Sequence, residues 1–295
     1  MWRLFGPQLS RLDRVSTFQT LLAALVVAFC AVPTPAAADA EPSRWVAAGL
    51  EDPTRPAPGD RVVIIGSSSI RGNFGRTLER RFAGLGFETF RQGVSSSGIS
   101  RPDYFDWYER ATTLPIDDHT AAVLIYVGVN DPQGIWMPPA EQKARGRRDR
   151  WIRWHEAMWD VVYRERMTAL IDRLCDRGAR RVVVLTPVDV RWRGLQERLV
   201  RVRRLQIEAA RTSRCGRVVS TSGDDLALRD PERGDVTLRM PDGYHLSTPG
   251  AEIVWDRIMP HLLRVVGGLP RATPEAERIA GDGETSAQAH DQDGG

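Results

Sequence analysis

Short apolar runs alternate with longer segments of helical periodicity through the middle of this chain. The apolar runs lie at 62–65, 121–127, 181–185 and 217–220, and a weaker one lies at 87–91. Between them, large apolar residues recur every three or four positions, which is typical of helices that bury one face. Buried strands joined by helices require a parallel sheet covered on both sides. The alternation therefore predicts an α/β fold with one three-layer α/β/α domain.

The N-terminal segment has the layout of a secretory signal. Arg3, Arg11 and Arg14 precede an apolar run at 21–33, and small residues follow that run. This order predicts a signal peptide at 1–38 and a periplasmic or secreted protein. The apolar run is shorter than the ~20 residues that a spanning helix needs. An uncleaved anchor stays open as an alternative, and it would be the only part of the chain to contact a membrane.

Two further segments differ in composition from the alternating region. Residues 39–60 are rich in proline and polar residues, which predicts a flexible linker. Residues 268–295 contain few large apolar groups, which predicts a disordered tail. The predicted domain therefore covers residues 61–267.

The charge of the chain gives no reason to expect a nucleic-acid partner. The sequence has 41 basic and 38 acidic residues, and loss of residues 1–38 removes three arginines and one aspartate. The remaining 38 basic and 37 acidic residues give a net charge of +1, with the two signs interspersed. No group of His, Cys, Asp or Glu has the spacing of metal ligands, so we expect no metal and no cofactor.

Two cysteines remain after the predicted signal peptide, Cys175 and Cys215. Each closes a predicted helix that leads into a predicted strand. If those two strands are neighbours, the helix ends lie side by side, and an oxidising compartment would let the cysteines join. We therefore predict a Cys175–Cys215 disulfide, which requires Cα atoms about 4.4–6.8 Å apart.

Polar residues gather where the predicted strands end. The first strand ends in "GSSS", and the loop after the second carries "QGVSSSGISRPDYFDW". The third strand ends in "YVGVNDPQ", and "RMPDGYHLSTPG" precedes the last predicted helix. Ligands of parallel sheets bind beyond the carboxyl ends of the strands. These four loops therefore predict one site.

The residues of these loops suit acyl transfer. A serine such as Ser68 becomes nucleophilic when a base takes its proton and a carboxylate holds that base. His245 and Asp242 could supply both from a single turn. Acyl transfer also needs donors for the developing oxyanion. The backbone N–H groups of Ser68 and Gly98 and the side-chain amide of Asn130 could supply these.

Four sequence blocks resemble, in order, the signature blocks of the SGNH/GDSL hydrolase superfamily. They are "IIGSSSIRG", "SSSGIS", "VGVND" and "DGYHLS", and the resemblance spans 61–266. The segments "SGISRPDYFDW", "GVNDPQ" and "MWDVVYRERM" are similar to an exported bacterial branch of uncharacterised SGNH proteins. The resemblance implies a flavodoxin-like sandwich with five parallel strands.

The resemblance also implies roles for individual residues. Ser68 would be the nucleophile, Asp242 and His245 would complete the triad, and Gly98 and Asn130 would be oxyanion donors. The family usually has aspartate before the nucleophile, whereas this chain has Ser67.

Simpler structural interpretations stand beside these. The three serines at 67–69 could cap a helix, Gly98 could relieve a tight turn, and Asn130 could form an Asx turn. Asp242 and His245 could be ordinary residues of a surface loop. Trp151, Trp154 and Trp159 have helical spacing, which favours packing over sugar binding.

These observations together predict an exported serine esterase, an acylhydrolase that removes O-acetyl or other short acyl groups. The expected substrate is an acylated small molecule or a cell-surface polysaccharide, and the expected state is a monomer. One alternative is an O-acyltransferase that modifies an exopolysaccharide or peptidoglycan. A second is a non-catalytic glycan-binding module.

Overall fold

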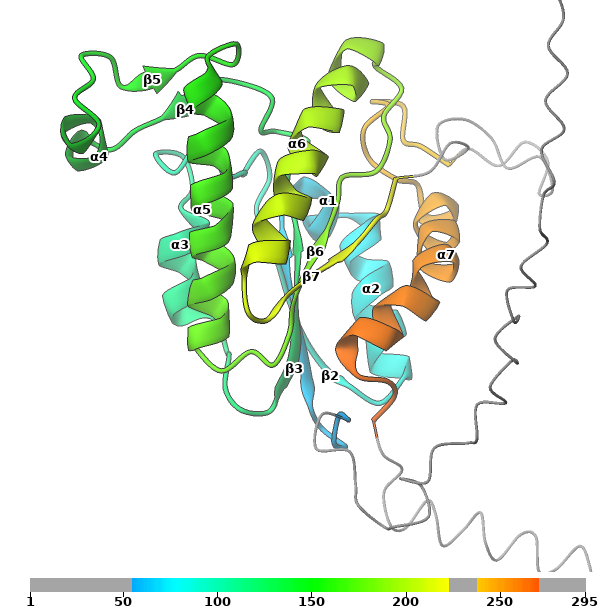
Figure 1. The fold of residues 1–295 in the computed structure, drawn as a ribbon. Helices are drawn as coiled ribbons and strands as arrows, with labels where there is room; N and C mark the ends of the chain where they lie inside the picture. The colour runs from blue at the N-terminus through cyan, green and yellow to red at the C-terminus, as the bar shows by residue number, and fades with distance from the viewer. Residues whose placement is uncertain (1–54, 223–237, 271–295) are drawn as a thin grey trace, which may run out of the picture. The chain divides into compact units, whose positions relative to one another are not determined.

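Five parallel strands form the central sheet (Figure 1). The computed structural model describes residues 55–222 and 238–270. The strand order is β2-β1-β3-β6-β7, and all neighbouring pairs are parallel. The strands are β1 (Arg61–Gly66), β2 (Glu88–Gly93), β3 (Thr120–Tyr126), β6 (Val182–Leu185) and β7 (Gly216–Val219). The predicted sheet of five parallel strands is confirmed.

The two faces of this sheet are buried by alternate residues of the same strands. In β1, Val63 and Ile65 belong to one apolar cluster, and Val62 and Ile64 belong to the other. Side chains alternate between faces along a strand, so a run that is apolar at every position is buried on both sides. All seven residues of β3 are buried for this reason.

Helices cover each face. On one side α5 (Ala157–Asp176) and α6 (Arg193–Thr212) bury apolar residues with the first cluster, and on the other α2 (Asn73–Gly84) and α7 (Thr248–Val266) do so with the second (Figure 1). The short helices are α1 (Ser68–Arg71), α3 (Trp107–Arg110) and α4 (Pro139–Ala144). The predicted three layers are therefore present.

Two helix boundaries differ from the simplest reading of the sequence. The apolar repeat that starts at Ile70 is divided between α1 and α2 by Gly72, whose backbone is extended. Helix α2 then approaches α1 closely, since a Cβ on Gly75 would lie 1.8 Å from the carbonyl oxygen of Ile70. Thr248 followed by Pro249 predicts a cap at Thr248. The cap of α7 is Ser247 instead, because the Ser247 hydroxyl accepts the N–H of Gly250 at 3.1 Å.

The predicted tryptophan cluster lies in an insertion between β3 and α5 and in the first turn of α5. The insertion contains the antiparallel pair β4 (Ile135–Trp136) and β5 (Trp151–Ile152). Trp159 is fully buried, stacks on Tyr163 with ring centroids 4.8 Å apart, and donates its indole N–H to the carbonyl oxygen of Gln133. The packing interpretation is confirmed for Trp159.

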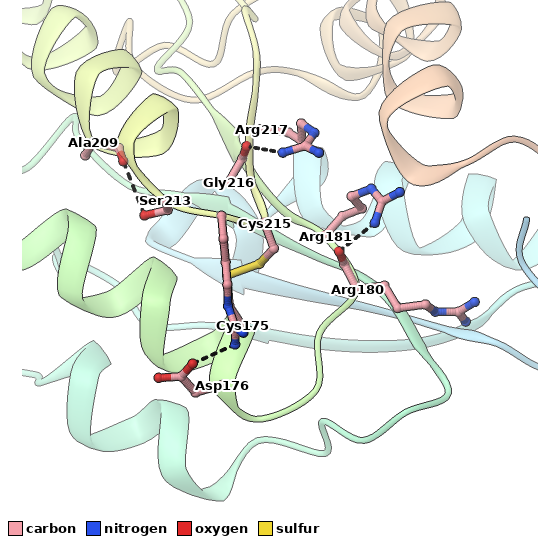
Figure 2. The surroundings of a disulfide bond; sticks show 10 residues. Cys175, Asp176, Arg180, Arg181, Ala209, Ser213, Cys215, Gly216 and Arg217 are labelled. Carbon is pink, nitrogen blue, oxygen red and sulfur yellow. Dashed lines mark hydrogen bonds and ion pairs between the residues drawn. A yellow bond between two sulfur atoms is a disulfide. The ribbon is translucent and has the colours of Figure 1, made fainter. Parts of the chain in front are cut away.

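The predicted disulfide is present (Figure 2). Cys175 lies in the last turn of α5, and Cys215 immediately precedes β7. Their Cα atoms are 6.0 Å apart. Strands β6 and β7 pair with each other, so the two helix ends that precede them are adjacent.

Several sequence predictions concern residues outside the described ranges. These are the signal peptide at 1–38, most of the linker at 39–60, and nearly all of the tail at 268–295. No helix in the described part of the chain is long and apolar enough to cross a membrane.

Candidate active site

Three of the predicted site residues surround one cavity at the carboxyl end of the sheet. Ser68 follows β1, Asn130 follows β3, and His245 lies in the loop before α7. The cavity has a volume of about 280 Å³. Its remaining lining residues are Ser69, Val129, Leu195 and Tyr244. Loops far apart in sequence therefore meet where a parallel sheet is expected to bind its ligand.

Ser68, His245 and Asp242 form a hydrogen-bonded chain. The Nε2 atom of His245 lies 2.6 Å from the Oγ atom of Ser68, and its Nδ1 atom lies 2.7 Å from Oδ2 of Asp242. An ionised carboxylate can only accept, so Nδ1 carries the proton and Nε2 is left to accept from the hydroxyl. This is the arrangement that activates a serine.

The turn at Asp242 holds its carboxylate in place. Oδ1 accepts the backbone N–H groups of Tyr244 and His245 at 2.8 and 3.0 Å. Burial alone would raise the pKa of Asp242, but the hydrogen bonds from the His245 side chain and from these two N–H groups outweigh it. The pKa of Asp242 is therefore lowered, and the group stays ionised while it orients the imidazole.

Close packing of two strands determines where Ser68 points. A Cβ on Gly66 would lie 2.1 Å from the carbonyl oxygen of Tyr126 on β3, so the chain can turn here only with glycine. The next residue, Ser67, is buried and is the N-cap of α1, yet its side chain makes no capping hydrogen bond. Ser68 is the first residue of α1, and its hydroxyl bonds to His245 instead of to the helix.

Asn130 is fixed against the loop that contains Gly98. Its Nδ2 atom donates to the carbonyl oxygen of Ser97 at 3.0 Å. A side-chain amide has two N–H donors, so the second is available to another acceptor. Gly98 lines a neighbouring cavity of about 250 Å³ together with Phe105 and Trp107.

Asp131 holds the same loop from inside, a contact that our sequence reasoning missed. Its buried carboxylate accepts the N–H groups of Ile99 and Ser100 at 2.7 and 2.9 Å, and the Tyr163 hydroxyl at 3.0 Å. A Cβ on Gly98 would lie 2.3 Å from Oδ1 of Asp131. The sequence signal was the "ND" pair, in which an acidic residue lies in the loop after a buried strand.

Other residues of the site were also absent from the sequence predictions. Tyr244 and Leu195 line the cavity, and Trp192 donates its indole N–H to the carbonyl oxygen of Asp242 at 3.0 Å. Among residues 55–222 and 238–270, no cluster of three or more His, Cys, Asp or Glu side chains could hold a metal ion.

Solved structures similar to this chain include hydrolases of low sequence identity. LAE5, an alpha/beta hydrolase enzyme from the metagenome of Lake Arreo, is 18% identical with a TM-score of 0.48, covering 73% of this chain and 98% of its own. A GDSL-like lipase from Bacteroides thetaiotaomicron is 13% identical with a TM-score of 0.44, covering 70% of this chain and 88% of its own. A variant of Axe2, an acetyl xylan esterase from Geobacillus stearothermophilus, is 16% identical with a TM-score of 0.44, covering 74% and 99%. At this level of similarity the matches carry no conclusion about activity.

A protein family matches most of the described domain. No curated protein sequence matches the chain. The family described as "Protein of unknown function (DUF459)" matches residues 61–261. The strand order and the four sequence blocks that meet at one edge of the sheet agree with the predicted SGNH hydrolase superfamily. Because the family match covers more than half of its length, the chain belongs to the DUF459 family.

Proposed function

We propose that this protein is an exported serine esterase that hydrolyses acyl esters with Ser68, His245 and Asp242. The observation that carries the proposal is the continuous hydrogen-bonded chain of 2.6 and 2.7 Å from the Ser68 hydroxyl through the imidazole to the carboxylate. Ser68 and His245 line a cavity, so an ester can reach the Ser68 hydroxyl.

In the first half of the reaction, His245 Nε2 takes the proton of the Ser68 hydroxyl while Oγ attacks the ester carbonyl carbon. Asp242 accepts a hydrogen bond from the Nδ1–H throughout, stays ionised and stabilises the imidazolium. The Asn130 amide, held at one N–H by Ser97, has its second N–H free for the oxyanion. The N–H groups of Ser68 and Gly98 are the other proposed donors.

Collapse of the tetrahedral intermediate breaks the bond to the alcohol. His245 returns its proton to the leaving oxygen, and the acyl group stays on Ser68 Oγ. In hydrolysis, water then gives a proton to Nε2 and attacks the acyl carbon. The bond between that carbon and Ser68 Oγ breaks, Nε2 returns its proton to Oγ, and the acid is released. An O-acyltransferase would admit a sugar hydroxyl at this second step. Product analysis with acetylated donors and unacetylated sugars distinguishes the two reactions.

Export and a cell-surface substrate form part of the same proposal. The Cys175–Cys215 disulfide supports an oxidising compartment, where such bonds persist. The predicted signal peptide at 1–38 points to the same compartment. An acylated cell-surface polysaccharide is therefore the substrate class we propose, with O-acetyl groups as the leading candidates.

The test is hydrolysis of a short acetyl ester by protein purified from an exporting host. Wild-type protein should turn the ester over and should be labelled covalently by a serine-directed phosphonate. Ser68→Ala should remove the labelling and nearly all turnover, while Ser67→Ala should retain both because the Ser67 side chain makes no capping bond. Turnover that survives Ser68→Ala would refute the mechanism and favour the glycan-binding module.

A further inference from the structure

Two large aromatic side chains lie exposed beside the Asp242–His245 turn. Trp192 is 57% exposed and Tyr244 is 36% exposed. Their rings are stacked, with centroids 6.3 Å apart and planes 27° apart. Two adjacent exposed aromatic rings form an apolar surface patch, and exposed apolar patches are common at binding sites.

The positions of both rings depend on the turn that carries the triad. The Trp192 indole N–H donates to the carbonyl oxygen of Asp242, and the Tyr244 N–H donates to the Asp242 carboxylate. Gly243 has φ +74°, which other residues rarely adopt, and a Cβ there would make a tight contact of 3.1 Å with Trp192 Nε1. The two rings are thus held in place before any ligand arrives, which lowers the entropic cost of binding.

The chemistry of the reaction shows which part of an ester would meet these rings. His245 Nε2 must reach the leaving oxygen in order to return the proton, so the alcohol lies on the side of His245. The carbonyl oxygen points toward Asn130 and the other donors. Tyr244 directly precedes His245 and lines the catalytic cavity, and Trp192 stacks against Tyr244. The aromatic pair therefore flanks the alcohol part of the ester, not the acyl part.

We propose that Trp192 and Tyr244 form an aromatic platform that binds a pyranose ring of the leaving alcohol. One face of a pyranose consists largely of C–H groups and can cover an aromatic ring, while the hydroxyls at its edge stay in reach of polar groups. The exposed residue Arg191, next to Trp192 in the chain, is a polar residue of this kind. This inference rests on the proposed esterase function and assigns its substrate as a sugar ester.

The first test measures binding without turnover, in a Ser68→Ala background. Isothermal titration calorimetry would use acetylated oligosaccharides of glucose, xylose and N-acetylglucosamine as probes. We expect at least one probe to bind, and we expect Trp192→Ala and Tyr244→Ala each to raise its Kd about tenfold, which corresponds to ~1.4 kcal/mol. Tyr244→Phe keeps the ring and should leave Kd within about twofold of the parent.

A matched control removes an exposed aromatic ring elsewhere. Tyr108 on α3 is 40% exposed and contacts the Arg173 guanidinium instead of the triad loop. Tyr108→Ala should leave the Kd unchanged. In active protein, the ratio of kcat/KM for the bound oligosaccharide to kcat/KM for ethyl acetate should fall about tenfold in the two platform variants, since only the sugar ester has a ring to place there.

The outcomes separate this inference from the proposed function. Hydrolysis of ethyl acetate without binding of any probe, or equal Kd values in parent and platform variants, would overturn the platform and leave the esterase. Binding that needs both rings in a protein without ester turnover would keep the sugar-binding role of the two rings but refute the esterase, and with it the assignment of the sugar as a leaving alcohol. A self-association that both alanine substitutions abolish would assign the rings to contact with a second copy, and would also overturn the inference.

Discussion

Removal of the Cys175–Cys215 disulfide should lower the stability of the domain substantially. The bond joins residues 40 positions apart, and the segment between them contains β6 and α6. In the unfolded chain the same bond closes a loop of this length and so reduces the conformational entropy that folding must overcome. The double variant Cys175→Ala with Cys215→Ala removes this constraint.

The expected loss follows from the length of the loop. A loop of 40 residues gives an entropy difference of about 13 cal/mol/K, which is about 4 kcal/mol at 25 °C. This is an upper figure, because unfolded chains retain some structure. A domain of this size shifts in Tm by about 2–4 °C for each kcal/mol, so the variant should melt about 8–16 °C lower than the oxidised protein.

The assay is thermal unfolding, followed by circular dichroism, of oxidised protein, reduced protein and the double variant. Reduction should move the wild-type Tm toward that of the variant and should leave the variant unchanged. A difference of less than about 2 °C between oxidised protein and variant would refute the loop-entropy reasoning. Alkylation and mass spectrometry should find both cysteines blocked, and two free thiols in exported protein would show that the bond does not form.

Three further predictions concern the site. Asn130→Ala should reduce ester turnover by a factor of about 10²–10³, because it removes one oxyanion donor. The circular dichroism spectrum should stay the same. Unchanged turnover would show that Asn130 only holds its loop at Ser97. Gly98→Ala should lower both stability and turnover, because the new Cβ would lie 2.3 Å from the Asp131 carboxylate. Gly84→Ala is the control and should lower neither, because a Cβ on Gly84 would have nothing within 4 Å. Equal Tm values for the two variants would contradict this packing argument. The pKa of Asp242 is lowered by its hydrogen bonds despite burial, so its carboxylate should stay ionised below the pH at which an ordinary aspartate takes up a proton. NMR titration of the Asp242 carboxyl should show this, and a pKa above the usual range of aspartate would refute it.

The sequence by itself determined the layers of the fold and the composition of the site. The four apolar runs and the weaker one correspond to the five strands. A strand of a parallel sheet is buried on both faces, so its sequence is apolar at nearly every position. The same topology brings the carboxyl ends of the strands to one edge, so the order of the four loops was enough to predict that Ser68, Asn130 and His245 lie together. The disulfide was predicted on the condition that the two strands are neighbours, and the structure meets that condition because β6 pairs with β7.

Local pattern did not determine the details that depend on distant residues. The division of the first apolar helical repeat at Gly72 reflects the close approach of α2 to Ile70, and periodicity does not contain that contact. From the local sequence alone, capping was the favoured interpretation of the three serines. It loses support for Ser68 because the hydroxyl finds a partner 177 positions away at His245.

Only the tertiary structure showed how the site is held and what lies beside it. Asp131 fixes the Gly98 loop through N–H groups 31 and 32 positions away, and Trp192 reaches the carbonyl of Asp242 across 50 positions. Each of these contacts joins segments whose separation in space depends on the packing of the whole sheet. The sequence shows which hydrogen-bond donors and acceptors are present, but the packing of strands and helices determines which of them pair.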